Sequence, residues 1–146
     1  MKKTILFLFT FIISAGLFAQ TKKSTTSAGG ALQTSIERGK QVYTASCLTC
    51  HQADGSGVPN LNPPLIQTKW VLGDKSTLIQ MLLKGSKAQV EIDGDMFHNT
   101  MPAQPQLTDQ QIADVLTYVR NSFGNKTSSV KITDVKSARK KLKSIE

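Results

Sequence analysis

Two cysteines and a histidine stand close together in the segment Cys47-Leu-Thr-Cys-His51. Positions i, i+3 and i+4 fall on one face of a helical turn, so the two thiols and the imidazole would point the same way. Two thiols at this spacing reach the two vinyl groups at the edge of a porphyrin, and the adjacent imidazole then faces the iron. C-x-x-C-H is the sequence signature of c-type haem attachment. We therefore predict one haem c, bound covalently through Cys47 and Cys50, with His51 as an iron ligand.

Two other kinds of site use paired cysteines. A structural zinc site needs four ligands, and Cys47, Cys50, His51 and His98 make up that number. Adjacent residues, however, suit a single tetrahedral ion poorly. A thioredoxin-like dithiol follows a strand in a βαβ unit, whereas a helical pattern precedes Cys47. Haem attachment is the prediction that fits best.

The residue on the far side of the iron decides what such a haem can do. A methionine thioether raises the reduction potential and closes the iron to external ligands. Met81 lies in an apolar helical segment and is interpreted as core packing, which leaves Met96, Met101 and His98 as candidates. A labile sixth ligand is the alternative, and it would make the chain a gas sensor or a peroxidase-like protein.

Three helices, one loop and one hairpin are expected around these residues. Each helix is indicated by apolar residues at helical spacing together with a capping or stop residue, and the hairpin by alternation around Asp-Gly. In chain order we first expect a helix over 34–47, capped by Thr34 or Ser35, and a loop over 54–64. A helix over 75–84 between Asp74 and Gly85 and a hairpin over 90–97 follow. The last helix starts at the capping box Thr108–Gln111 and ends before Gly124.

The chain has 146 residues, which is enough for one domain of ordinary size. Residues 1–19 combine a basic start, an apolar run and small residues near Ala19, the pattern of a cleaved export signal. That apolar run is shorter than the roughly 20 residues of a spanning helix, so an uncleaved membrane anchor is the weaker interpretation. Residues 20–31 read as a flexible leader, 32–125 as the domain, and 126–146 as a basic extension. The expected location is the periplasm.

The net charge of +8 does not indicate a nucleic-acid binder. Residues 32–125 contain seven basic and eight acidic residues, so the positive charge lies in the flanking segments rather than on the domain.

The basic extension has apolar residues that are spaced to share one helical face, namely Val135, Ala138, Leu142 and Ile145. The extension is therefore either a small helix packed on the domain or a solvated tail, and contact between its basic residues and a membrane surface or an acidic subunit is a further expectation.

Several short segments together resemble a class I cytochrome c, over about Ser35 to Asn125. The likeness is carried by Gly39-Lys-Gln-Val-Tyr43, Cys47-Leu-Thr-Cys-His51, Pro63-Pro-Leu65, Asn99-Thr-Met-Pro102 and Leu107-Thr-Asp-Gln-Gln-Ile112. Within that class the chain is similar to bacterial monohaem cytochromes and to cytochrome subunits that accept electrons from periplasmic dehydrogenases. The resemblance implies an all-α fold of about three to five helices around one haem, with a short hairpin before the axial methionine.

The same resemblance implies roles for particular residues. Met101 matches the segment that carries the family's axial methionine, and Gly39 stands where the first and last core helices cross, beside Tyr43 and Tyr118. A proline carbonyl after the haem motif, from Pro63 or Pro64, would accept the second ring N–H of His51. Trp70 would donate its indole N–H to a haem propionate, or is an ordinary core tryptophan. Asn99 would bond near the methionine sulfur or simply turn the chain.

These expectations together describe an electron carrier rather than an enzyme. The expected donor is a redox protein such as a periplasmic dehydrogenase, and the expected acceptor is a terminal oxidase or reductase. No nucleic-acid partner is expected, and the chain would act as a monomer or as a subunit of a complex.

Overall fold

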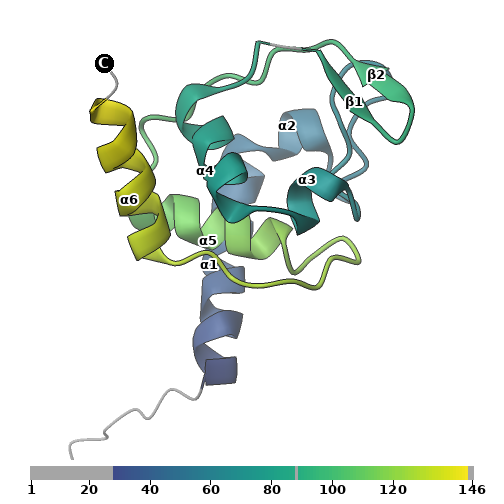
Figure 1. The fold of residues 1–146 in the computed structure, drawn as a ribbon. Helices are drawn as coiled ribbons and strands as arrows, with labels where there is room; N and C mark the ends of the chain where they lie inside the picture. Colours follow the sequence, from purple (N-terminus) through teal and green to yellow (C-terminus); the bar gives the residue numbers. More distant parts are fainter. Residues whose placement is uncertain (1–27, 88, 145–146) are drawn as a thin grey trace, which may run out of the picture.

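The computed structural model describes residues 28–144 with the exception of residue 88 (Figure 1). The predicted export signal and most of the predicted leader lie outside the described residues. In chain order the elements are α1 (Ala28–Ser46), α2 (Leu48–His51), α3 (Lys69–Leu72), α4 (Lys75–Lys84), β1 (Val90–Ile92), β2 (Asp95–Phe97), α5 (Asp109–Val119) and α6 (Ile132–Lys143). The fold is mainly helical, as predicted, and two of its six described helices have only four residues.

The close crossing of α1 and α5 forms the centre of the fold (Figure 1). Gly39 lies against the backbone of α5, and a β-carbon at this position would be 2.1 Å from the carbonyl oxygen of Asp114. Beside this contact the rings of Tyr43 and Tyr118 pack with their centroids 5.3 Å apart. The helix crossing that the resemblance implied at Gly39 is confirmed.

The first helix starts earlier than predicted, and the predicted caps are wrong. Thr34 lies inside α1, where its hydroxyl donates to the carbonyl of Gly30. Ser35 donates instead to the carboxylate of Asp114 at 2.6 Å, and Arg38 forms an ion pair with the same carboxylate at 2.7 Å. These side chains therefore join α1 to α5 rather than cap α1.

The predicted boundaries of α4, the hairpin and the start of α5 are confirmed. The carboxylate of Asp74 caps α4, and Gly85 follows it with φ at +72°. The strands pair antiparallel with Val90 opposite Phe97, and the turn uses positive φ at Asp93 and Gly94. Thr108 opens α5 with the predicted capping box.

Two elements of the structure were not resolved by the sequence patterns. The short helix α3 was not predicted; Thr68 caps it by accepting from the backbone N–H of Val71. The extension after Asn125 forms the helix α6, whose Val135 is fully buried. Figure 1 shows α6 beside α4 and α5, on the other side of the domain from the hairpin. Within the described range, none of the helices has the length and apolar character needed to cross a membrane.

Candidate haem-binding site

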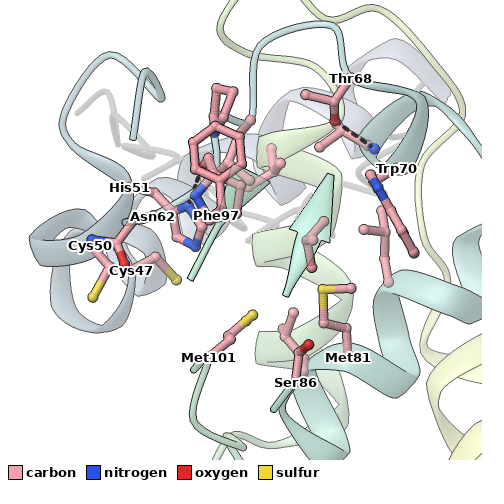
Figure 2. Close-up of a pocket in the computed structure, with 18 of the residues that line it drawn as sticks. Cys47, Cys50, His51, Asn62, Thr68, Trp70, Met81, Ser86, Phe97 and Met101 are labelled. Atoms are coloured by element: carbon pink, nitrogen blue, oxygen red, sulfur yellow. Dashed lines mark hydrogen bonds between the residues drawn. The ribbon is translucent and has the colours of Figure 1, made fainter. Parts of the chain in front are cut away.

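The cysteines and histidine predicted to bind haem lie on consecutive turns at the junction of α1 and α2. The backbone N–H of Cys47 donates to Tyr43 at 2.8 Å, and that of His51 donates to Cys47 at 3.0 Å, so helical bonding continues through the motif. Cys47 is half-buried and Cys50 is exposed, and both are free thiols. Figure 2 shows all three side chains on one side of a pocket.

The structure favours neither a redox dithiol nor a zinc site. Burial, with a smaller contribution from the charge of Cys50, raises the pKa of the Cys47 thiol to about 11. A redox dithiol depends on a thiolate, which this raised pKa disfavours at pH 7. His98, which would complete a zinc site, is exposed and does not line the pocket. The part of the chain that the structure describes contains no group of three or more His, Cys, Asp or Glu residues that could hold a metal ion.

The ring of His51 is oriented by one hydrogen bond. Its Nδ1 donates to the carbonyl oxygen of Pro63 at 3.0 Å, which leaves Nε2 as the ring atom available to a metal. Burial lowers the pKa of His51, and the Pro63 bond opposes this effect only in part, so the imidazole is neutral at pH 7. Of the two prolines considered from the sequence, Pro63 supplies the carbonyl; Pro64 lines the pocket.

The loop that presents the Pro63 carbonyl is held tightly against the motif. The N–H of Gly57 donates to the carbonyl of His51 at 3.1 Å, and a β-carbon on Gly57 would lie 2.3 Å from the carbonyl oxygen of Asn62. The φ of Gly57 is +69°, a conformation that favours glycine. Only glycine fits here without moving the Pro63 carbonyl that orients His51.

Met101 is held by the backbone at the end of α4. Met101 and Ser86 exchange two backbone hydrogen bonds, each of 2.9 Å. A β-carbon on Gly85, the cap residue that precedes Ser86, would lie 2.5 Å from the Met101 carbonyl oxygen. Met101 lines the pocket, and its thioether points into it (Figure 2). The rivals Met96 and His98 are exposed residues that do not line the pocket.

The structure brings one further methionine to the pocket. Met81 was interpreted from the sequence as core packing, but its side chain lines the pocket from α4 (Figure 2). This difference has a simple cause, because a helix face that packs on a buried cofactor has the same apolar spacing as one that packs on other side chains. Met81 is therefore a second thioether that must be distinguished from Met101 by experiment.

Trp70 supplies the clearest sign that the pocket is shaped for a polar group at one edge. The indole lines the pocket from α3, and its Nε1 is buried with no hydrogen-bond acceptor among the described residues. Buried polar groups nearly always have a partner. A haem carboxylate in the pocket would provide one. Asn99, by contrast, donates its amide to the side chain of Asn62 at 3.0 Å, and both residues line the pocket.

The rest of the pocket wall is predominantly apolar and comes from several elements. A flat apolar ring with two carboxylates at one edge fits such a wall together with His51, Met101 and the free Trp70 N–H. The sequence analysis did not identify most of these wall residues, because their apolar spacing only indicates burial. They are Tyr43, Leu65, Val71, Leu78, Leu82, Val90, Ile92, Phe97, Val115, Leu116 and Val119.

Comparison with known sequences agrees with this geometry. The sequence model for cytochrome c matches residues 36–123, a span that contains the haem motif, the pocket and Met101. The chain belongs to the cytochrome c family. It is a class I c-type cytochrome, an electron-carrying protein that binds haem c covalently, and its two cysteines stand at the positions of the C-x-x-C-H motif.

The relatives include individual cytochromes and cytochrome subunits of dehydrogenases. The chain is 34% identical over 100 residues to cytochrome c-552 of Thermus thermophilus, an alignment that covers 66% of this chain and 67% of the relative. It is 37% identical over 108 residues to the gluconate 2-dehydrogenase cytochrome c subunit of Pantoea cypripedii, covering 71% of this chain but 24% of that subunit. A quinone-dependent alcohol dehydrogenase cytochrome c subunit from Gluconobacter oxydans is 29% identical over 103 residues, covering 69% of this chain and 22% of the subunit.

Proposed function

We propose that this cytochrome carries single electrons between exported redox proteins, with His51 and Met101 as the two axial ligands of its haem. The observation that supports this most directly is that both side chains line one pocket from separate segments, each held by backbone contacts. Met96 and His98, the other ligands considered, do not line that pocket. When bound, haem c supplies a one-electron Fe(III)/Fe(II) couple.

The protein's own groups would attach, orient and shield the cofactor. The sulfurs of Cys47 and Cys50 would form the two thioethers, and the Pro63 carbonyl would keep the neutral ring of His51 oriented for binding the iron. The thioether of Met101 would supply the other protein ligand and exclude external ligands. The apolar wall keeps water from the iron, and the exposed Cys50 marks the side on which a porphyrin edge would be accessible to a redox partner.

The ligand assignment can be tested with three matched substitutions, Met101→Leu, Met81→Leu and Met96→Leu. Leucine keeps much of the side-chain volume and removes the sulfur. We expect the ferric protein to show the near-infrared iron–sulfur charge-transfer band in the wild type, in M81L and in M96L, and to lose it only in M101L. The reduced wild type should bind no carbon monoxide, whereas reduced M101L should bind it.

Two results would contradict the proposal in different ways. Loss of the band in M81L with its retention in M101L would make Met81 the ligand. A wild-type protein without the band that binds carbon monoxide rapidly would be a haem protein with a labile sixth ligand, such as a gas sensor or a peroxidase-like protein.

The partners and the location belong to the same proposal. The relatives include cytochrome subunits of gluconate, alcohol and fructose dehydrogenases and a subunit of a cbb3-type oxidase, which supports a dehydrogenase as donor and an oxidase or reductase as acceptor. We infer a periplasmic location from the predicted export signal. Identification of the proteins that co-purify with the chain tests the proposed partners. Amino-terminal sequencing of the mature protein tests cleavage of the signal, which an unprocessed amino terminus would contradict.

A further inference from the structure

The extension after Asn125 lies outside the span matched by the cytochrome c family, yet it is firmly attached to the domain. Thr117 and Val130 exchange two hydrogen bonds through the threonine hydroxyl, of 3.0 and 3.3 Å. Val130 and Val135 are 5% and 0% exposed, so they belong to the same core as α4 and α5. The extension is therefore an integral part of this structure rather than a solvated tail.

A buried guanidinium strengthens this attachment. Arg120 is 2% exposed and donates to the carbonyl of Val71 at 2.7 Å and to that of Gly73 at 2.9 Å. Its remaining donors bond Ser128 and the hydroxyl of Thr127. Arg120 thus fixes the first residues of the extension against α3 and the end of α5.

The helix α6 then runs along α4 and α5, with an ion pair at each end of its contact surface. Near its start, Asp134 pairs with Lys75 of α4 at 3.2 Å. Five residues further on, Arg139 pairs with Asp109 of α5 at 2.7 Å. The second donor of Arg139, Nη2, bonds the backbone carbonyl of Leu107 at 2.6 Å.

That carbonyl belongs to the short connection between Met101 and α5. The connection is held from the inside by α4, because the N–H of Gln104 donates to the carbonyl of Leu82 at 2.7 Å. Leu107 itself is buried, and its N–H donates to Gln104 at 3.3 Å. Arg139 bonds the other end of the same connection, so the segment that follows Met101 is attached to α4 at Gln104 and to α6 at Leu107.

We propose that α6 clamps the segment Met101–Leu107 and that Arg139 is a positioning residue for the axial methionine. This inference rests on the proposed function, in which Met101 is the sixth ligand. A thioether ligand leaves the iron when its segment opens locally, and such openings become more frequent when the contacts that close the segment are removed. The charge-assisted bonds of Arg139 to Leu107 and Asp109 are contacts of this kind.

The test compares Arg139→Gln with two controls in the full-length holoprotein. Lys140→Gln removes the same charge from the same helix, but Lys140 is exposed and its side chain has no hydrogen bond or ion pair within the described residues. Lys75→Gln removes the ion pair at the other end of α6. The readouts are the rate at which ferric protein binds imidazole, the intensity of the iron–sulfur band, and the free energy of unfolding in urea.

We expect R139Q to bind imidazole roughly tenfold faster than wild type, the change that corresponds to loss of about 1.4 kcal/mol from the closed state. K140Q should match the wild type. K75Q should lower the global unfolding free energy without accelerating imidazole binding, because its contact lies away from the methionine segment. R139K, which keeps the charge but not the two-pronged geometry, should give an intermediate rate and serves as the test if R139Q does not fold.

An unchanged imidazole rate in R139Q, or an equal acceleration in K75Q, would overturn the positioning role. Absence of the iron–sulfur band from the wild type would instead contradict the proposed function itself. The two failures are therefore distinguishable.

Discussion

The backbone of Gly39 in α1 touches the backbone carbonyl of Asp114 in α5. A β-carbon at Gly39 would lie 2.1 Å from that oxygen and 2.7 Å from the β-carbon of Tyr118. The obstructing atoms include rigid helix backbone and not the end of a flexible side chain. The distance between the two helices is therefore set by the absence of a side chain at this position.

Gly39→Ala should lower the free energy of unfolding by about 2 kcal/mol or more, because the two helices must move apart to accommodate the methyl group. Gly29→Ala is the matched control in the same helix, since no atom lies within 4 Å of its β-carbon position. Alanine is the better helix former, so G29A should be neutral or stabilising by up to about 1 kcal/mol. Urea unfolding measures both changes; equal effects of the two substitutions would contradict the packing argument.

If Met101 is the sixth ligand, as proposed, Gly85→Ala should weaken its bond to the iron. The substitution places a methyl group 2.5 Å from the Met101 carbonyl oxygen at a residue with φ of +72°. Backbone strain alone would cost about 1 kcal/mol or more, and the contact would additionally displace the Met101 segment. The iron–sulfur band of the ferric protein should therefore decrease, and reduced protein should begin to bind carbon monoxide.

Gly94→Ala separates the two causes in this prediction. Gly94 has a φ of +92° but no atom within 4 Å of its β-carbon position, so it shares the strain without the contact. G94A should lose stability and keep the iron–sulfur band. A band that decreases equally in both variants would show that the Gly85 contact does not position Met101.

The elements that the sequence predicted well are those fixed by local signals. The capping carboxylate of Asp74 and the stop at Gly85 delimit α4, and Thr108 with Gln111 starts α5, because these residues satisfy backbone groups within a few positions of themselves. The hairpin turn at Asp93-Gly94 is local in the same sense. The C-x-x-C-H motif is also local, since one helical turn brings its three side chains together.

The features that the sequence did not reveal depend on contacts between distant segments. Ser35 has the chemistry of a helix cap, but the buried Asp114 carboxylate of α5 competes for its hydroxyl. Met81 has the spacing of a core residue, and only the arrangement of α4 around the pocket distinguishes the two roles. In the sequence Arg139 does not differ from the other basic residues of the extension, because its hydrogen bond to the Leu107 carbonyl forms only in the folded structure.

Trp70→Phe tests whether the free indole N–H serves the cofactor. If Nε1 donates to a haem propionate, its removal leaves that carboxylate with more effective negative charge, which favours ferric iron. The midpoint potential should then fall by an amount on the order of 50 mV, equivalent to about 1 kcal/mol for one electron. Spectroelectrochemical titration measures the change. An unchanged potential, accompanied only by a loss of stability, would make Trp70 a core residue.

The carboxylate of Asp114 should make folding stability depend on pH in the acidic range. Burial by itself raises its pKa, but the hydrogen bonds from Arg38 and Ser35 outweigh this effect and hold the pKa below its ordinary value. A carboxyl group whose pKa is lowered by folding stabilises the protein above its unfolded pKa of about 3.9, and that contribution is lost as the pH falls through the folded value. Wild-type protein should therefore lose stability below about pH 4.

Asp114→Asn should remove the part of this pH dependence that Asp114 contributes. At pH 7 we expect the substitution to lower the free energy of unfolding by about 2 kcal/mol, because Arg38 would lose a charged partner whose side chain is only 2% exposed. The 46% exposure of the Arg38 side chain limits this loss, since water can solvate the unpaired guanidinium. As the pH falls towards 2, the difference between D114N and wild type should shrink, as measured by urea unfolding at successive pH values. Asp95→Asn, which removes an exposed carboxylate from the hairpin, is the matched control and should change the free energy of unfolding little. A D114N curve that stays parallel to wild type would show that the pair of Arg38 and Asp114 contributes no charge-dependent stability.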